Sequence, residues 1–213
     1  MTAARMTELD LLPFLRAHEC FRRDFTRLHD LVTRGAPPPR VVRALVEHWE
    51  NLSAVLVHHH ENEDAVILPR VHARFPAAAV RELTAEHERL DDLLGQVGPA
   101  LVAAGRDHAE AARVVGAARA LLVAHLDAEE RVLVPLFAEC FTAAEWAEME
   151  ARTTRDLEAA GLFPFLLPWI TEGFDDAVLA GTLSGFPAEA GERFHTSWRR
   201  DYERRCALLW ADA

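Results

Sequence analysis

The chain has 213 residues, 50% of them hydrophobic and 27% charged, which is typical of a soluble globular protein with one domain or one domain and an appendage. A formal net charge of −11 without any Lys/Arg-rich run argues against nucleic acid as a partner, because the chain would repel a polyanion. No segment is long and apolar enough for a signal sequence or a membrane span, and the three widely spaced cysteines indicate reduced thiols in a cytoplasmic protein.

Helical periodicity runs through nearly the whole chain, and alternating strand patterns are absent. The pattern predicts four long helices, which cover residues 7–33, 41–75, 75–97 and 107–140. Helix breakers mark the connectors: RGAPPPR follows the first helix, and Gly98, Pro99 and Gly105 precede the fourth. Long helices with short connectors predict an all-α fold, an up-down-up-down four-helix bundle over residues 1–140.

Residues 141–213 are predicted to form an additional C-terminal helical segment, with helices over 142–161, 163–183 and 187–210. Thr142 is the expected N-cap of the first of these helices, and Gly161 its stop. The apolar face of this segment must be buried, either against the bundle or in a homodimer contact. Its most apolar stretch, LFPFLLPWI, either walls off a pocket or pads the bundle, and padding is the favoured interpretation.

The second and fourth helices contain the same pattern, HHENEDAVILP and HLDAEERVLVP, at a constant offset, since 125 − 59 and 129 − 63 both equal 66. In each copy a histidine precedes a glutamate by four residues: His59 and Glu63 in one, His125 and Glu129 in the other. Residues four apart lie on one face of a helix, one turn apart, so both side chains can reach the same metal ion.

The first and third helices each add one histidine in phase with their apolar stripes: His18 lies between Phe14 and Phe21, and His87 between Leu83 and Leu90. Inward carboxylates without a counter-charge would cost several kcal/mol, so a cation is expected beside the glutamates. Bundle di-metal sites have this composition, with carboxylates bridging two ions and histidines at the ends. The predicted metal ligands are His18, His59, Glu63, His87, His125 and Glu129.

The other histidines are not predicted as ligands. His58 and His60 lie about 100° around the helix from His59 and should leave its face, either as partners of the ligands or as solvent-facing side chains. His29 and His48 share the face of a predicted ligand but lie about 16 Å away along the helix axis. No companions are evident for His72, His108 and His195.

Each copy of the repeated pattern also contains an acid directly after the glutamate and a proline six residues after it. Asp64 and Glu130 are expected to accept hydrogen bonds from the ligand histidine rings. Pro69 and Pro135 either end or kink their helices, or bend them around the site.

His18 together with HHHENED, EHERL and HLDAEERVLVP resembles the hemerythrin-like HHE cation-binding family, over residues 7 to about 140. The tail is of the sort seen on bacterial members. The resemblance implies a four-helix bundle with two non-haem iron ions, bridged by an oxo or hydroxo group. It also implies that Glu63 and Glu129 are bridging ligands and that the terminal ligands are His18, His59, His87 and His125.

The chain departs from the oxygen-carrying hemerythrins, which have a fifth histidine on the third helix; here Leu83 and Asp91 stand one turn either side of His87. The bridge from the fourth helix is Glu129 or Glu130. Glu129 is preferred because it repeats Glu63 and lies within about 40° of His125, compared with about 140° for Glu130. Four His and two Glu resemble the bacterial iron-cluster repair proteins instead.

The sequence leaves three classes of function open. The first is binding or sensing of oxygen, nitric oxide or hydrogen peroxide, for example in a stress response. The second is a di-iron oxidase or oxygenase with a small organic substrate. The third is iron storage or iron-cluster repair, although the N-terminus lacks a Cys-bearing segment for repair. His and Glu donors suit iron, manganese or zinc, and iron is expected from the resemblance alone.

Overall fold

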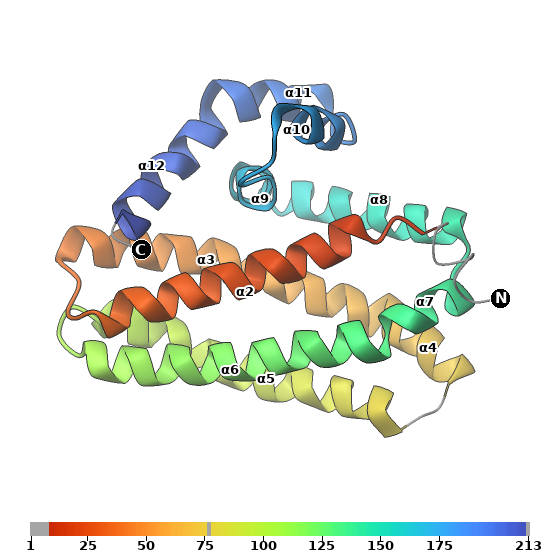
Figure 1. The fold of residues 1–213 in the computed structure, drawn as a ribbon, viewed down its shortest axis with the longest axis horizontal. Helices are drawn as coiled ribbons and strands as arrows, with labels where there is room; N and C mark the ends of the chain where they lie inside the picture. The colour runs from red at the N-terminus through yellow and green to blue at the C-terminus, as the bar shows by residue number, and fades with distance from the viewer. Residues whose placement is uncertain (1–8, 76–77, 212–213) are drawn as a thin grey trace.

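The computed structural model of the chain describes residues 9–75 and 78–211. Residues 7–8 and 76–77, which the sequence pattern places in helices, lie outside the described residues. The described residues form helices and no strand, in a helical bundle with further helices after it (Figure 1). The predicted all-α bundle with an additional C-terminal helical segment is confirmed.

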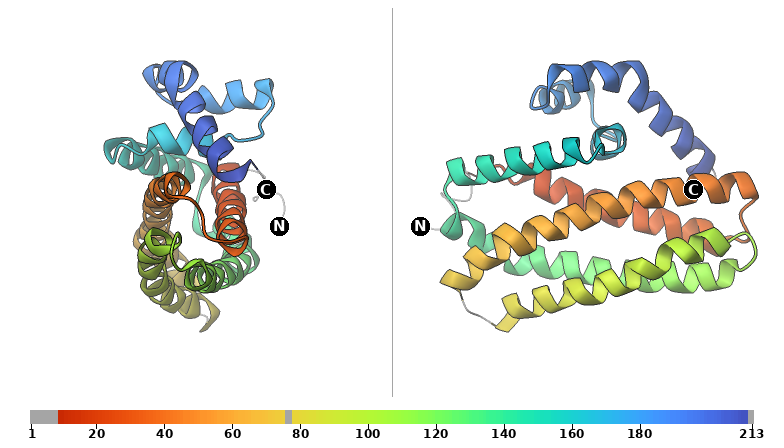
Figure 2. Two further views of the ribbon diagram at one scale, coloured as in Figure 1. Left: turned by 90° about the vertical axis from the view of Figure 1, so that its left-hand side faces the viewer. Right: turned by 180° about the vertical axis from the view of Figure 1, so that it is seen from behind.

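Four long helices run alternately up and down the bundle (Figures 1 and 2). They are α2 (Leu12–Thr33), α3 (Pro39–Asn62), α5 (Ala78–Ala103) and α6 (His108–Val132). Helix α3 continues through a π-helical segment, η1 (Glu63–Ile67), into α4 (Leu68–Arg74), and α6 continues into α7 (Val134–Cys140). Pro39 begins α3, and the Asp107 side chain caps α6 by accepting a hydrogen bond from the Glu110 amide.

Both prolines in the repeated pattern interrupt a helix without ending it. Proline has no N–H to donate, so regular α-helical hydrogen bonding cannot continue through Pro69 or Pro135. The second helix accommodates Pro69 with the π-helical segment η1, after which the Leu68 amide donates to the carbonyl of Glu63. In the fourth helix the irregular residue is Leu133, directly before α7. π-helical segments such as η1 often occur at functional sites, and η1 begins at Glu63, a predicted ligand.

The bundle interior contains two apolar clusters with a polar layer between them. The larger cluster includes Phe21, Leu56, Leu90 and Leu126, and the smaller one lies toward α4 and α7. Along each bundle helix, the predicted metal ligands stand between a residue of one cluster and a residue of the other. In α2, for example, His18 lies between Phe14 and Phe21. The two clusters therefore fix the polar layer along the bundle axis.

The C-terminal segment contains more helices than its periodicity predicts. They are α8 (Ala143–Ala159), α9 (Phe163–Ile170), α10 (Asp176–Leu183), α11 (Ala188–Arg193), a π-helical segment η2 (Phe194–Trp198) and α12 (Arg199–Trp210). The expected helices over 163–183 and 187–210 are thus each divided. The ends of α8 agree with prediction: Thr142 and Glu145 form a capping box, and Gly161 takes a positive φ of 73°.

The segment packs along the side of the bundle formed by α2 and α3: α9 contacts α2, α8 contacts α3, and α12 contacts both helices (Figures 1 and 2). Of the two burial modes expected for its apolar face, the contact with the bundle is present. Trp169, for instance, has no exposed surface. The segment therefore extends the hydrophobic core of the bundle.

A buried polar junction around Asp24 joins α9 to the bundle. The Oδ2 atom of Asp24 accepts hydrogen bonds from the indole of Trp169, at 3.0 Å, and from Nε2 of His48, at 2.8 Å. The Oδ1 atom accepts one from the guanidinium of Arg23, at 2.7 Å. Asp24, His48 and Trp169 have no exposed surface, so this Asp24 junction is a fully desolvated contact between the segment and the bundle.

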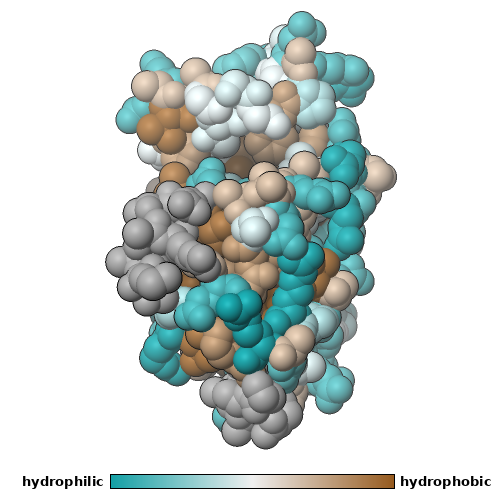
Figure 3. All heavy atoms as spheres, turned by 90° about the vertical axis from the view of Figure 1, so that its right-hand side faces the viewer, coloured by the Kyte–Doolittle hydropathy of each residue, from teal (hydrophilic) through white to brown (hydrophobic). Residues whose placement is uncertain are grey.

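In the described residues, no helix is long and apolar enough to cross a membrane. The end of the molecule that carries α4 and α7 exposes hydrophobic atoms interspersed with hydrophilic ones (Figure 3). Large exposed hydrophobic side chains such as Leu12, Val102 and Leu208 are scattered over different elements.

Candidate metal centre

Two groups of His and Glu side chains lie between the apolar clusters, each with ligand atoms within 4.8 Å of one another. One group consists of His18, His59, Glu63 and Glu129. The other consists of His60, Glu63, His87 and His125. The fold thus brings together all six residues that the sequence pattern predicts as ligands, and it adds His60.

Glu63 belongs to both groups because its two carboxylate oxygens face different histidines. Oε1 lies 3.5 Å from Nε2 of His59, and Oε2 lies 3.6 Å from Nε2 of His87. Glu63 is fully buried at the junction of α3 and η1. Its carboxylate is therefore placed to bind one ion through each oxygen.

Glu129 spans the same two groups from the opposite helix, α6. Its Oε2 lies 3.7 Å from Nε2 of His18, and its Oε1 lies 3.1 Å from Nε2 of His125. Glu130 has a different position: its Oε1 lies 3.0 Å from the outer ring nitrogen, Nδ1, of His18, and Arg22 donates to the same oxygen at 2.7 Å. Of the two alternatives for the bridging carboxylate, Glu129 is the one inside the cluster.

Carboxylates also hold two other histidine rings in orientation. Nδ1 of His87 lies 2.9 Å from Asp64, and Nδ1 of His125 lies 3.0 Å from Glu86. With Nδ1 occupied in this way, Nε2 of each ring points toward the other ligands. The contacts of Asp64 and Glu130 agree with the sequence-based expectation, whereas Glu86 was not predicted.

The expectation that His60 turns away from the cluster is wrong. Its ring is 4% exposed, stacks on the ring of His87 with centroids 4.4 Å apart, and has no hydrogen-bond partner at either nitrogen in the described part of the chain. His59 faces the His18 side of the site and His60 the His87 side, because the buried face of α3 is wide enough for both. A signal was present in the sequence: His60 continues the stripe of Leu52 and Leu56 at a spacing of four residues.

Burial and neighbouring charges set the protonation of the cluster. Burial lowers the pKa of His59 well below its ordinary value and lowers the pKa of His60 to about 3, so both rings are neutral, as metal ligands must be. Burial, with the charge of Glu129, raises the pKa of Glu63 well above its ordinary value. Burial would also raise the pKa of Glu129, but the adjacent rings of His125 and His87 outweigh it and hold that pKa well below the usual range.

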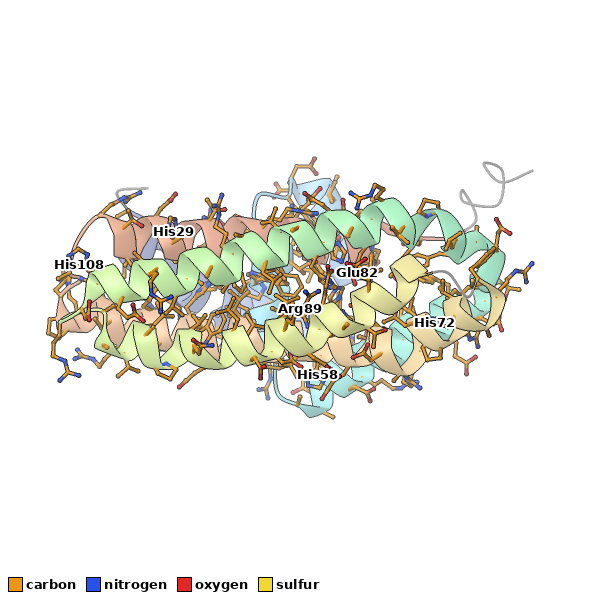
Figure 4. The ribbon with its side chains drawn as sticks, turned by 90° about the horizontal axis from the view of Figure 1, so that it is seen from below. His29, His58, His72, Glu82, Arg89 and His108 are labelled. Carbon is orange, nitrogen blue, oxygen red and sulfur yellow. The ribbon has the colours of Figure 1, made fainter. Side chains whose placement is uncertain are left out.

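The remaining histidines lie outside both groups. His48 belongs to the Asp24 junction. Figure 4 labels His29, His58, His72 and His108, which are spread along the bundle and apart from one another. Their absence from the cluster agrees with the sequence-based expectation.

An apolar cavity of about 160 Å³ adjoins the cluster on the His59 side of α3. His59 and Asn62 line one part of it, Glu150 of α8 lines another, and Leu166 and Trp169 of α9 contribute to the walls. The stretch LFPFLLPWI has both of the roles considered for it: Phe163, Phe165 and Leu167 pack into the main apolar cluster, as the favoured interpretation of padding expects, and Leu166 and Trp169 also line the pocket. On another side of α3, a more open cavity of about 430 Å³ reaches His60 past three carboxylates, those of Glu61, Asp64 and Asp91.

The profile of the hemerythrin HHE cation-binding domain matches residues 13–152 of the chain. The chain belongs to this family. The match to the hemerythrin family runs through all four bundle helices and into α8, so it includes the complete His/Glu cluster. Comparisons with curated proteins and with solved structures give no match.

The cluster in this hemerythrin-family chain has the donors and the spacing that metal ions require. Two donor atoms bound to one ion at about 2.1 Å and at a right angle lie about 3.0 Å apart. The Nε2 atoms of His18 and His59 are 3.0 Å apart, and those of His87 and His125 are 3.1 Å apart. In the described part of the chain, all four carboxylate oxygens of Glu63 and Glu129 are buried without a hydrogen-bond partner. A bound cation would satisfy these oxygens.

Proposed function

We propose that the chain is a non-haem di-iron protein that binds or reacts with oxygen, nitric oxide or hydrogen peroxide, in a sensing or stress-response role. The observation that supports this most directly is the pair of buried carboxylates, Glu63 and Glu129, because the two oxygens of each lie near histidines on different sides of the site. Iron is proposed rather than manganese or zinc because of the hemerythrin family, since imidazole and carboxylate donors suit all three metals.

In the proposed centre the two ions have unequal numbers of histidine ligands. Glu63 and Glu129 would contribute to holding both ions; His18 and His59 would hold one, and His60, His87 and His125 the other. The His18/His59 side would have one imidazole fewer, so it is the side that we propose for an external ligand. The iron supplies the ligand binding and redox chemistry, while the chain supplies neutral imidazoles and an interior from which water is excluded.

A second candidate function is the oxidation of a small organic molecule. The apolar cavity beside His59 favours it over iron storage or cluster repair, because those two functions do not call for an apolar pocket next to the metals.

The metal content of the purified or iron-reconstituted protein tests the proposal. We expect about two iron ions per chain, and absorbance changes when the anaerobically reduced protein receives oxygen or nitric oxide in separate experiments. Reversible uptake of oxygen would favour a carrier or sensor, and rapid irreversible oxidation would favour an enzyme. A protein that binds no metal from iron, manganese or zinc solutions would contradict the proposal.

Alanine variants of the three consecutive histidines should differ in metal content. His59→Ala and His60→Ala each remove a proposed ligand, so each should lower metal occupancy. Loss of a residue that only hydrogen-bonds to a metal ligand typically lowers metal affinity by roughly 10- to 100-fold, and loss of a ligand should lower it by at least as much. His58→Ala is the matched control, because the His58 ring lies outside both groups. Elemental analysis after dialysis measures the outcome. Full occupancy in His60→Ala would remove His60 from the ligand set.

A further inference from the structure

The apolar cavity lies between the bundle and the C-terminal segment. Its floor comes from the α2–α3 side of the bundle, with Phe14, Ala17 and His59 among the lining residues. Its roof comes from α8 and α9, and Phe186, between α10 and α11, closes part of it. The cavity therefore exists because residues after 140 fold back over the bundle.

The size of the cavity limits what it can hold. Its volume of about 160 Å³ is close to that of an engineered apolar cavity in another protein, about 150 Å³, which binds benzene. Large aromatic and aliphatic side chains form most of the lining, including Trp146, Met149 and Leu166, all of which are buried. An apolar molecule with about one aromatic ring fits this space.

The few polar groups in the lining indicate the polarity of the ligand. The hydroxyls of Thr153 and Thr154 donate to carbonyls of their own helix. The other polar side chains of the lining are His58, His59 and Asn62 of α3 and Glu150 of α8, and Glu150 is the carboxyl among them. Burial and the nearby charge of Asp10 raise the pKa of Glu150 to about 7. Above pH 7 this carboxyl is ionised, so in a chain with a net charge of −11 it disfavours anions and accepts a hydrogen bond from a hydroxyl or amine.

We propose that this cavity is a binding site for a small, non-anionic organic molecule of about one aromatic ring that carries one hydrogen-bond donor for Glu150. His59 lines the opposite part of the cavity, and its ring packs between Phe14 and Phe21, with centroids 5.3 and 5.5 Å away. A bound ring therefore lies against a residue of the metal centre. This last point, and only this one, rests on the proposed di-metal function.

Phenol, toluene and benzoate are suitable probes, because they share one ring and differ in donor and charge. Calorimetric titration of the full chain, both metal-free and zinc-loaded, should show binding of phenol and toluene. Phenol should bind about 2- to 10-fold more tightly, as expected for one hydrogen bond, and benzoate should not bind. Absence of phenol and toluene binding, or equal binding of benzoate, would overturn the proposal.

Two variants test the location of binding. Ala17→Leu fills the cavity from α2 and should weaken phenol and toluene binding at least tenfold. Ala112→Leu is the control, a similarly half-buried alanine that packs against the core on α6 and does not line the cavity. Unchanged binding in a folded Ala17→Leu variant would contradict the assignment.

Glu150→Met should remove the preference for phenol over toluene, whereas Glu148→Met on the exposed face of the same helix should keep it. If Ala17→Leu does not fold, Phe186→Ala provides an independent test, because it enlarges the cavity. Naphthalene should then bind, although it is too large for the original chain. Failure of Phe186→Ala to alter the size preference would also overturn the proposal.

Proximity to the metal centre can be tested separately with manganese. Paramagnetic Mn²⁺ in the centre should increase the proton relaxation rate of bound phenol, and diamagnetic Zn²⁺ should not. Phenol binding without this increase would refute the contact with the centre. Phenol binding by a chain that takes up no metal would refute the proposed di-metal function and uphold the cavity.

Discussion

Glu63→Gln is expected to abolish the binding of both metal ions. The two oxygens of Glu63 face different histidine groups, so the substitution removes one anionic donor from each ion, and an amide nitrogen cannot replace it. Glu61→Gln, two residues earlier and with a largely exposed side chain, should retain both ions. Elemental analysis after dialysis gives the metal content of both variants. Retention of two ions by Glu63→Gln would contradict the bridging role.

The same substitution should have opposite effects on stability with and without metal. An ion present at 1,000 times its dissociation constant stabilises the folded chain by about 4 kcal/mol, and Glu63→Gln should lose this stabilisation. Without metal, the variant should unfold less readily than the original chain, by about 1–3 kcal/mol, because glutamine has no ionised form, whereas burial and the charge of Glu129 disfavour the ionised form of Glu63 in the folded chain. Denaturant titrations of both proteins, with zinc or a chelator, measure this reversal.

A comparison of Glu129→Gln with Glu130→Gln extends the test to the fourth helix. Glu129→Gln should lose both ions, as Glu63→Gln should, because the two oxygens of Glu129 also face different histidine groups. Glu130→Gln should only weaken binding, by roughly 10- to 100-fold, because Glu130 orients the ring of His18 and is not itself inside the cluster. The opposite ranking would show that Glu130 is the bridging ligand.

Asp24→Ala is expected to destabilise the fold by about 1–3 kcal/mol, the cost of leaving buried donors without their acceptor. His48 and Trp169 would lose the carboxylate that joins α9 to the bundle, whereas Arg23 would keep Glu172 as a partner at 3.2 Å. Denaturant unfolding measures the free energy, with Asp30→Ala as the control because Asp30 is exposed on the same helix. Metal content should be unchanged, since Asp24 lies outside the His/Glu cluster. A loss of stability below 1 kcal/mol would mean that the Asp24 junction does not hold the segment in place.

The Asp24 junction should also make stability depend on pH at the acidic end. Burial alone would raise the pKa of Asp24, but the hydrogen bond with His48 and the charges of His48 and Arg23 lower it below its ordinary value. The stabilisation is therefore fully present above the unfolded carboxyl pKa of about 3.9 and is lost as the pH falls toward the lower folded value. The difference in unfolding free energy between the original chain and Asp24→Ala should shrink over that range.

The bundle and most of the His/Glu cluster could be predicted from the sequence because both depend on spacing within single helices. A period of 3.6 residues places His59 above Glu63 and His125 above Glu129, whatever the rest of the chain does. The apolar residues on either side of His18 and His87 place those rings in the interior for the same reason.

Contacts between helices could not be predicted in this way. The angle of 100° between His59 and His60 is correct, but it would exclude His60 from the His/Glu cluster only if the buried face of α3 were narrow. Helix α3 instead faces α5 as well as α2, so two consecutive histidines both turn inward, with His60 buried and the side chain of His59 13% exposed. Glu86 was missed for a similar reason, because its partner His125 belongs to another helix.

The sequence by itself determined an all-helical bundle and the duplicated His/Glu pairs, since local periodicity carries that information. Only the tertiary structure decided that His60 joins the cluster, that Glu129 rather than Glu130 lies inside it, and that LFPFLLPWI lines part of a cavity as well as packing on the bundle. Each of these depends on how separate helices pack against one another. That packing follows from the shapes of side chains distant in sequence, such as Phe14, Trp146 and Trp169, which no spacing rule relates.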